Sequence, residues 1–460
     1  MYFASKLDSM TSKDIISKLK ELPSDKIKFA IVDIDGVLRG KILHRSKFLK
    51  GLDEGMGFCN VVFGWDSNDV CYDNTLASGW HTGYPDAICN VDLNTLRYVP
   101  WEDNIPFFLG DFSQSEPGVR AACPRSLLRR IRQECIDLGY TPMFAQEFEW
   151  FNFQETPQSW HDKNYHSPTP LTPGMFGYSI LRPSVNPVFY HQLFDDLTAF
   201  GIPIEGLHTE TGPGVYEAAI IYDDILESAD RATLFKTGVK EIAYRHGIMA
   251  SFMAKWSEEL PGCGGHIHQS LWDSEQTQNL FYAPESPHKM SELMKHYVAG
   301  QLHCLPYILP MFVPNVNSYK RLVKGSWASV SASWGIENRT TALRVINHGA
   351  KSMRLETRVP GADSNPYLAM SASLAAGLYG IKNRLPLPDP TYGSAYDSAA
   401  NPPLPTSLYE AIDLMKNSTL AAELFGEEFC DHFIRTREWE WRQFSQVVTQ
   451  WELKRYFEII

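Results

Sequence analysis

The pattern of apolar and polar positions changes character at about residues 115–124. Before that point, over residues 58–110, short apolar runs are broken by Asp, Asn, Gly and Pro, which is typical of strands joined by turns. The run KFAIVDIDGVLRGKIL predicts a β-hairpin, because Asp35–Gly36 is a favoured tight turn between two apolar runs. Residues 1–25 predict a leading helix, with Ser12 or Asp14 as its cap. We therefore expect a small, sheet-rich N-terminal part.

From Pro124 onward the pattern predicts longer helices alternating with strands. The segment RSLLRRIRQECIDLG has apolar residues at helical spacing and ends at Gly139, a suitable C-terminal cap. Further long helices are expected at 188–200, 228–246, 290–304, 366–381 and 407–415. Loop-rich stretches are expected at 155–176, 257–264, 273–288 and 385–406. No internal repeat or low-complexity segment is evident.

Composition narrows the class of protein. The chain has 460 residues, of which 44% are hydrophobic, and its formal charge is 42 − 54 = −12. An acidic chain repels a phosphate backbone, so nucleic acid is not expected as a partner. The apolar run 368–381 is too short for a membrane span, and the N-terminus lacks the apolar core of a secretory signal. The eight cysteines form no C-x-x-C pair and are expected to be reduced thiols. We expect a cytoplasmic protein with no membrane partner.

Two pairs of glutamates are the first candidates for chemistry. Glu147 and Glu149 lie two residues apart on a predicted strand, so they point to the same face. Glu210 and Glu217 flank Pro213–Gly214, where a tight turn would place them opposite each other. Like charges held together are unfavourable unless a cation lies between them. An exposed strand face and a flexible acidic hairpin are the alternatives without function.

Histidines and arginines complete the candidate set. His266 and His268 follow a glycine-rich loop and share one face of a strand, although this pattern alone is weak evidence for a ligand site. Charged residues gather again toward the C-terminal third of the chain, where a structural ion-pair ladder is the alternative. These residues are Arg339, Arg344, Arg354, Glu356 and Arg358. Arginine matches the geometry of carboxylates and phosphates.

The combined set suits divalent cations and phosphoryl transfer. Five glutamates with one or two histidines and no thiolate favour Mg²⁺ or Mn²⁺ over structural zinc. Two such ions neutralise phosphate oxygens while arginines hold the transferring group. The chain has neither a Walker sequence nor a dinucleotide-binding fingerprint, so the nucleotide must be held by another arrangement.

At this point the order of the motifs resembles that of the glutamine synthetase family, over nearly the whole chain. The matching segments are DIDGVLRGK (33–41), E-x-E-W-F (147–151), ETGPGVYE (210–217), GCGGHIHQSLW (262–272), NSYKRLVKG (317–325), NRTTALRV (338–345) and RLETRVPGADSNPYLAMSA (354–372). The resemblance implies an α+β fold with a small β-grasp-like N-terminal domain (1–118) and a large catalytic domain (119–460). The catalytic domain would contain a curved antiparallel sheet flanked by helices. Subunits would form a ring-shaped homo-oligomer, a dodecamer, with active sites at subunit boundaries.

The resemblance also implies roles for individual residues. Glu149, Glu210 and Glu217 would hold one metal ion, and Glu147, His266 and Glu356 the other. ATP would contact His268, Ser270, Arg344 and Arg354, and Arg339 would stabilise the transferring phosphate. Arg321 and Arg358 would bind the carboxylates of glutamate, beside Gly262. ATP would phosphorylate the γ-carboxylate of glutamate, and an amine would then displace phosphate.

Departures from the family pattern point away from ammonia. Where ammonia-using members have a flap glutamate that binds and deprotonates ammonium, this chain has Trp327 after RLVKGS. Their D-G-S-S-type segment corresponds here to FGWDSN, in which Asp66 is the only nearby substitute. Pro261 and Val215 also replace residues usual in the family, which puts recognition of the donor acid in doubt.

These departures favour a γ-glutamyl–amine ligase of the kind that acts on polyamines, alkylamines or aromatic amines. An aromatic side chain at position 327 can line an apolar pocket or stack on a cationic amine. The alternative for Trp327 is that it packs beneath a loop. Alternatives for the whole chain are an ammonia-using glutamine synthetase, a ligase for another acid, and a non-catalytic assembly.

Overall fold

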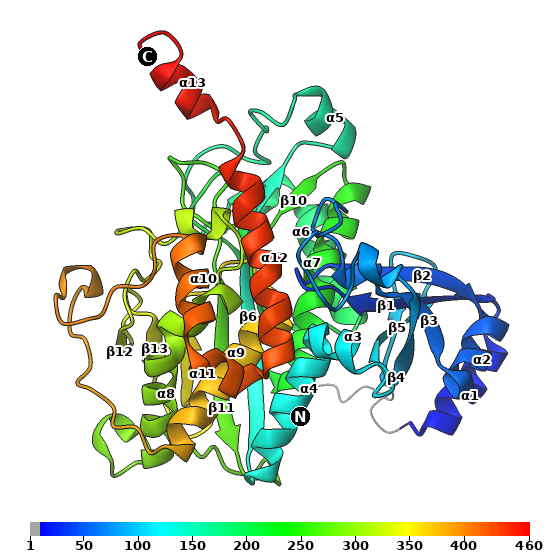
Figure 1. Ribbon diagram of the computed structural model, residues 1–460, viewed down its shortest axis with the longest axis horizontal. Coiled ribbons are helices and arrows are strands. Elements are labelled where there is room, and N and C mark those ends of the chain that lie inside the picture. Colours follow the sequence, from blue (N-terminus) through cyan, green and yellow to red (C-terminus); the bar gives the residue numbers. More distant parts are fainter. Residues whose placement is uncertain (1–9) are drawn as a thin grey trace.

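The computed structural model describes residues 10–460, and its strands form two sheets (Figure 1). The first sheet lies at one end of the molecule and has five strands in the order β2-β1-β5-β4-β3. Its strands are β1 (Lys26–Val32), β2 (Leu38–His44), β3 (Met56–Cys59), β4 (Asp86–Val99) and β5 (Ile105–Phe112). The expected hairpin is confirmed, since β1 and β2 pair antiparallel around Gly36, whose φ is 80°.

The two faces of this first sheet pack into two different hydrophobic cores. On β1, Phe29 and Ile31 point into a small core under helices α1 (Ser12–Glu21) and α2 (Arg45–Glu54). Ala30 and Val32 point the other way, into the main core of the molecule. This follows from the alternation of side chains along a strand, and it explains why β1 is apolar at nearly every position.

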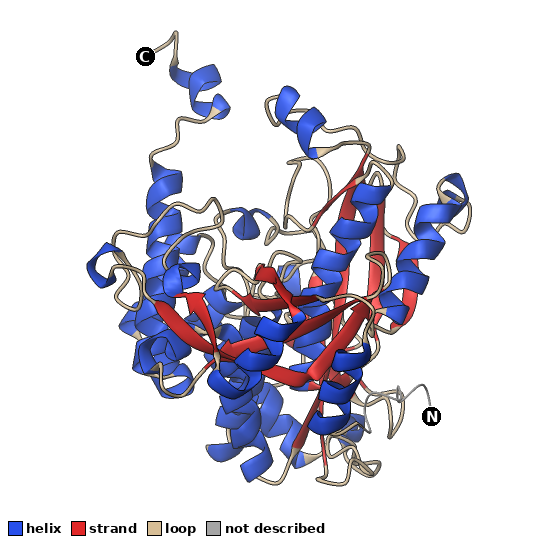
Figure 2. Ribbon diagram, turned by 90° about the vertical axis from the view of Figure 1, so that its right-hand side faces the viewer, coloured by secondary structure: helices blue, strands red, loops and turns tan. Residues whose placement is uncertain are grey.

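The second sheet carries most of the candidate residues. It has nine strands, with the order β12-β13-β14-β11-β6-β8-β7 and with β9 and β10 pairing beside this path with β6. Its strands are β6 (Thr141–Phe153), β7 (Ile204–Thr209), β8 (Val215–Ile220), β9 (Asp223–Asp224), β10 (Met249–Ser251), β11 (Gly265–Trp272), β12 (Trp334–Ile336), β13 (Leu343–Ile346) and β14 (Arg354–Thr357). All its pairings are antiparallel except β12 with β13. The sheet curves through the body with helices around it (Figure 2), which confirms the expected α+β class.

Helices close the outer side of the second sheet. Those in contact with β6 are α4 (Pro124–Asp137), α7 (Ile225–Arg245) and α9 (Pro366–Lys382). Behind α9 lie α8 (Glu292–Ile308) and α11 (Thr419–Phe425), and α8 also contacts α10 (Leu408–Asn417). α9 is buried along nearly its whole length, which accounts for its continuous apolar sequence. Within residues 10–460, no helix combines the length and apolarity that a membrane crossing requires.

The predicted helices are present, but several others were not predicted. α6 (Pro187–Ala199), α7, α8, α9 and α10 lie where long helices were expected. Unpredicted ones are α2, α3 (Pro117–Ala122), α5 (Pro157–Asp162), α11, α12 (Glu427–Ser445) and α13 (Gln450–Tyr456). The short α5 lies inside a stretch expected to be loop. For α1, the capping residue is Thr11 rather than Ser12 or Asp14, because the Thr11 side chain accepts a hydrogen bond from the Asp14 backbone N–H. Residues 1–9 of the expected leading segment lie outside the described residues.

A buried ionic cluster joins the first sheet to α4 and α7, the helices that contact β6 of the second sheet. Arg125, on α4, binds both carboxylate oxygens of Asp230 on α7, at 2.9 and 2.8 Å. The same guanidinium reaches Asp92 on β4 at 2.8 Å and Asp111 on β5 at 3.4 Å. Shared core and shared ion pairs therefore connect the two sheets. The boundary between residues 118 and 119, and the β-grasp description of the first part, stay predictions.

Candidate active site

A cavity of about 790 Å³ opens over one face of the second sheet. Every predicted site residue lines it except Asp66 and Ser270. The predicted residues in its wall are Glu147, Glu149, Glu210, Glu217, Gly262, His266, His268, Arg321, Trp327, Arg339, Arg344, Arg354, Glu356 and Arg358. The structure thus gathers in one place side chains that are up to about two hundred residues apart in sequence.

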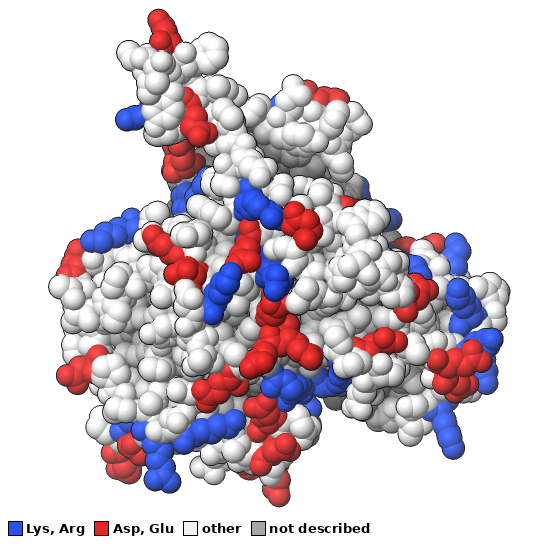
Figure 3. Space-filling model, viewed as in Figure 1, with Lys and Arg blue, Asp and Glu red and all other residues white. Residues whose placement is uncertain are grey.

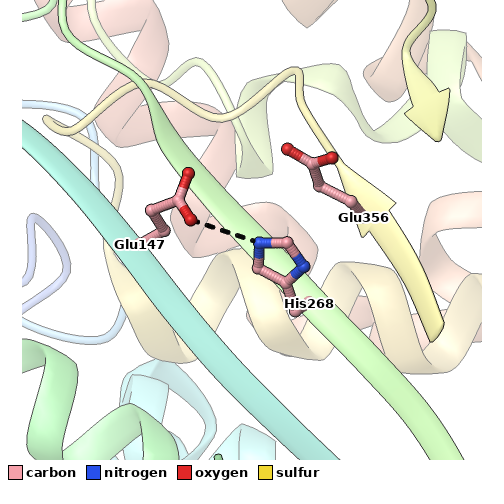
Figure 4. Close-up of side chains that lie close together, drawn as sticks. All are labelled: Glu147, His268 and Glu356. Carbon is pink, nitrogen blue, oxygen red and sulfur yellow. Dashed lines mark ion pairs between the residues drawn. The ribbon is translucent and has the colours of Figure 1, made fainter. Parts of the chain in front are cut away.

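Strand register explains one half of this cavity. Glu147 on β6 lies opposite His266 on β11, and His268 on β11 lies opposite Glu356 on β14. The side chains therefore emerge on the same face from three neighbouring strands. Nδ1 of His266 lies 3.3 Å from Glu147 and 3.6 Å from Glu356. Nε2 of His268 lies 3.6 Å from Glu147, as Figure 4 shows with Glu356 nearby.

The other half is built by β6, β7 and β8. Glu149 lies opposite Glu217, and Glu217 lies opposite His208, whose Nε2 is 3.7 Å from the Glu217 carboxylate. The expectation that Glu210 faces Glu217 across the turn was wrong in register. Glu210 instead follows the last residue of β7, and its backbone N–H donates to Val215, so the loop starts there. Both glutamates still reach the cavity.

His208 and Tyr178 are cavity residues that the sequence pattern did not single out. Their rings stack with centroids 4.4 Å apart. The His208-Thr-Glu210 spacing is the same two-residue spacing as in Glu147–Glu149 and His266–His268, and it was the available signal for His208. Tyr178 lies in a stretch without regular structure and gives no comparable pattern.

The electrostatics of the acidic side favour a bound cation. Burial, together with the charges of Glu147, Glu149 and Glu210, raises the pKa of Glu217 to about 11. Burial and the neighbouring Glu149 also raise the pKa of Glu210. One oxygen of Glu210, Oε2, is buried with no hydrogen-bond partner among the described residues. An unpaired buried acceptor surrounded by carboxylates is costly, and a divalent ion would remove that cost.

Donor atoms within 4.8 Å of one another form two groups in the described part of the chain. They are Glu147, His268 and Glu356, and His208, Glu210 and Glu217. Hard oxygens with a minority of imidazole suit Mg²⁺ or Mn²⁺, so the residues present fit the implied ions. These groups contain His268 and His208, which were not expected as ligands, and they lack the expected ligands Glu149 and His266. His266 remains within reach of Glu147 and Glu356, and the assignment of each ligand stays a prediction.

Arginines supply the positive charge of the cavity. Arg344 and Arg358 both bind Glu356, and Arg344 does so at 2.9 Å. Burial alone would raise the pKa of Glu356, but Arg358 and the two histidines lower it to about 2, so this carboxylate stays ionised. Arg354 donates to Nδ1 of His268 at 3.1 Å, which leaves Nε2 of that ring directed at Glu147. Arg321 is fixed by the backbone oxygen of Val359 at 2.9 Å.

Trp327 stands in the cavity wall with 64% of its surface exposed. Its φ of 61° is uncommon for a bulky residue, and the loop holds it there. The alternative that Trp327 is packed beneath a loop does not hold, because its side chain is mostly accessible.

Two predicted residues lie outside the cavity lining. The carboxylate of Asp66 accepts hydrogen bonds from the backbone N–H of Val70 at 3.0 Å and from the indole N–H of Trp439 at 2.9 Å. Ser270 follows His268 on β11 but is nearly buried, and its hydroxyl accepts a hydrogen bond from Trp272. Within the cavity of this single chain, neither residue is positioned for the role expected of it.

Comparisons with known proteins point in one direction. The family model described as "glutamine synthetase, catalytic domain" matches residues 121–456. A protein named type-1 glutamine synthetase 2, from Dictyostelium discoideum, is 50% identical over 100% of this chain and 88% of its own length. A glutamate–isopropylamine ligase from a Pseudomonas species is 39% identical over 95% of each chain. A solved structure titled GmaS/ADP complex superposes with a TM-score of 0.84 at 25% identity, covering 96% of this chain and 99% of its own.

Proposed function

The chain belongs to the glutamine synthetase family and is an ATP-dependent carboxylate–amine ligase, and we propose that it joins glutamate to an organic amine. Enzymes of this family use ATP and divalent metal ions. In the proposed reaction the γ-carboxylate oxygen of glutamate attacks the terminal phosphorus of ATP, and ADP leaves. The amine nitrogen then attacks the acyl carbon, the bond from carbon to the phosphate oxygen breaks, and the nitrogen loses a proton as phosphate departs.

The residues of the cavity divide this work by charge. The carboxylates of Glu147, Glu210 and Glu217, with the neighbouring imidazoles, hold the cations, which when bound neutralise phosphate oxygens. On the positive side, Arg339 is assigned to the transferring phosphate. Arg321 is assigned to the carboxylates of glutamate. Fixed positive groups stabilise the charge that develops in the transition state without having to reorganise.

The arginines near Glu356 also hold the side chain of this proposed metal ligand in place. Glu356 is bound on both oxygens, by Arg344 and by Arg358. A carboxylate with two fixed partners presents its remaining lone pairs in one direction. We infer that the ATP-side arginines and the metal ligand form one preorganised unit, in which Arg354 orients His268 in the same way.

Exposed Trp327 is the observation that carries the choice of an organic amine. It occupies the position of the glutamate that binds ammonium in ammonia-using members, and an indole accepts no proton. Its accessible, apolar surface faces the cavity, where it can contact the substituent of an amine. The relative named glutamate–isopropylamine ligase supports this choice.

An ammonia-using enzyme is the second candidate, favoured by the name of the relative that is 50% identical. The two candidates differ in one measurable quantity. Phosphate release from ATP and glutamate, measured across alkylamines, aromatic amines, polyamines and ammonia, should give the highest kcat/KM with an organic amine. If ammonia is the best acceptor, the proposal is wrong.

A variant sharpens that comparison. Trp327→Glu restores a carboxylate at the acceptor side and should shift the ratio of kcat/KM toward ammonia. Tyr409→Glu is the matched control, because Tyr409 is an aromatic residue that is 59% exposed on α10 and does not line the cavity. If the ratio of kcat/KM for ammonia to that for the organic amine is the same in Trp327→Glu and in the control variant, Trp327 does not contact the acceptor.

We also propose self-assembly into a ring-shaped homo-oligomer, a dodecamer, in the cytoplasm. The exposed apolar side chains of the last residues support assembly, since large accessible apolar patches mark interfaces. They include Val447, Val448, Trp451, Phe457, Ile459 and Ile460. In an assembly, Asp66 would act in a site shared between subunits. Native mass spectrometry measures the subunit number, and a monomer would contradict the proposal.

A further inference from the structure

A second cavity, of about 390 Å³, adjoins the candidate active site and shares Trp327 and Arg339 with it. We propose that this second cavity receives the substituent of the acceptor amine, and that the substituent it accepts is electrically neutral. The inference rests on the proposed use of an organic amine. It adds where the amine lies and which class of amine the enzyme takes.

The residues that the two cavities share indicate how the amine lies, with its nitrogen in the first cavity and its substituent in the second. Arg339, assigned to the transferring phosphate, lines both cavities, so the acyl phosphate and the attacking nitrogen must lie close to it. Carbon atoms attached to that nitrogen need space that glutamate and ATP do not fill. The second cavity begins at this point, since Trp327 and Arg339 belong to both linings.

The walls of the second cavity are largely apolar. The indole of Trp327, the side chain of Ile336 and the ring of Tyr392 line it. Tyr392 is 78% exposed, so its ring stands at the mouth instead of filling the interior. Aromatic and aliphatic walls favour burial of a hydrocarbon substituent, because removing apolar surface from water is favourable.

Hydrogen bonds hold these walls in place. The side-chain amide of Asn338 donates to the backbone oxygens of Thr391 at 3.1 Å and Gly393 at 2.8 Å. The N–H of Thr391 donates to Trp334 on β12 at 2.8 Å. The hydroxyl of Thr340 accepts from the N–H of Ala395 at 2.9 Å. The segment that carries Tyr392 is therefore fixed to the turn that carries Arg339, so the cavity is formed before a substrate binds.

The charges around the cavity exclude a second ammonium group. Glu337 is the acidic residue among those that line it, and its carboxylate already binds Arg344 and lies 3.0 Å from Nε2 of His348. Arg339 adds positive charge to the lining. A distal ammonium would lose its hydration beside Arg339, and the Glu337 carboxylate is already paired with Arg344 through one oxygen, which is unfavourable. Monoamines with neutral alkyl or aryl substituents therefore fit this cavity, and polyamines do not.

The first test compares two amines of equal length, pentylamine and putrescine, which differ in having a methyl or an ammonium at the far end. With the wild-type enzyme, ATP and glutamate, kcat/KM should be at least about tenfold higher for pentylamine, since a mismatched group in a fitted pocket costs a factor of ten or more. Equal values, or a preference for putrescine, would overturn the inference.

The second test introduces a carboxylate into the wall. Tyr392→Asp should lower the ratio of kcat/KM for pentylamine over putrescine severalfold, whereas Tyr392→Phe should keep it. Tyr244→Asp is the matched control, because Tyr244 is 51% exposed on α7 and lines neither cavity. A ratio in Tyr392→Asp equal to that of the control would overturn the inference. Ammonia as the best wild-type acceptor would instead remove the proposed function itself, so the two failures are distinguishable.

Discussion

At the scale of single residues, the cost of gathering like charges is the main argument for bound cations. Glu147, Glu149, Glu210 and Glu217 share one cavity, and the pKa of Glu217 is raised to about 11 by burial and its neighbours. Repulsion between these carboxylates destabilises the folded chain unless a cation binds to them.

Metal binding should therefore stabilise the folded protein. Adding Mg²⁺ or Mn²⁺ at a hundredfold excess over Kd should raise the free energy of unfolding by about 3 kcal/mol, measured as a rise in Tm. Glu210→Gln should reduce this rise, because Glu210 Oε2 has no other partner in the described structure. Glu205→Gln, at an exposed position on β7, should behave like wild type. No rise in Tm with either ion would contradict the cation site.

The sequence predicted many of these residues because strands impose a two-residue period. Glu147 with Glu149, and His266 with His268, could be placed on one face before any fold was available. His208 and Glu210 have the same spacing, but His208 was not singled out, since a single histidine near a glutamate is common. The facing of Glu210 and Glu217 was misplaced because the turn is centred on Gly212–Pro213, one residue before the expected Pro213–Gly214, so His208 lies opposite Glu217.

At the scale of elements, the joint between the two sheets depends on one buried guanidinium. The side chain of Arg125 is 1% exposed and binds Asp230, which is 2% exposed. Arg125→Met would leave Asp230 without its bidentate partner and should destabilise the fold by roughly 3–5 kcal/mol. Urea denaturation measures this change.

Arg129 supplies the control for that prediction. It binds the same Asp92 and Asp111 at 3.0 Å, but its side chain is 39% exposed. Arg129→Met should cost no more than about 1 kcal/mol, as is typical of accessible ion pairs. Equal losses in the two variants would mean that burial does not decide the strength of this joint.

A buried histidine on α12 should make stability depend on pH. Burial lowers the pKa of His432 from 6.5 to about 4, against the opposing charge of Asp431, so the ring is neutral in the folded protein. As the pH falls through 6.5, the unfolded chain takes up a proton that the folded chain does not, and stability decreases. Between pH 7 and pH 5 this loss is roughly 2 kcal/mol.

Replacement of the ring removes that dependence. His432→Leu should show a smaller loss of unfolding free energy between neutral and acidic pH than wild type does. His161→Leu, which removes a histidine that is 68% exposed, should keep the wild-type slope. A wild-type slope in His432→Leu would show that His432 is not held neutral.

The same elements show where prediction from sequence failed. α12 has the sequence EEFCDHFIRTREWEWRQFS, whose many charges obscure the buried stripe of Phe429, Phe433 and Trp439. β4 is a single strand of 14 residues with a bulge between Asp92 and Arg97. Its polar residues made it look like several short runs. Tertiary packing decides both cases, and packing is not visible in local patterns.

At the scale of the whole molecule, the surface and the cavity have different characters. On the face shown in Figure 3, acidic and basic side chains are interspersed, and the net charge of −12 is spread widely. The cavity instead gathers carboxylates and arginines in one lining, and Glu356 pairs there with Arg344 and Arg358. A reaction between an anionic nucleotide and an anionic amino acid requires fixed positive groups of this kind.

The overall architecture could be anticipated only by resemblance. Alternation of helices and strands predicted the mixture of elements, but the curved sheet and its strand order depend on pairings between distant segments. β11 pairs with both β6 and β14, and these two partners lie on opposite sides of it in sequence. Nothing in the local sequence of β11 specifies either partner.

The central claim is that this cavity activates a carboxylate by phosphorylation. The most direct test is to measure whether an oxygen atom passes from glutamate to phosphate. Glutamate carrying isotopically labelled oxygen in its γ-carboxylate is incubated with ATP, Mg²⁺ and an organic amine, and the released phosphate is analysed by mass spectrometry. The account predicts one labelled oxygen in each phosphate, together with a γ-glutamyl amide. Unlabelled phosphate accompanying amide formation would contradict it.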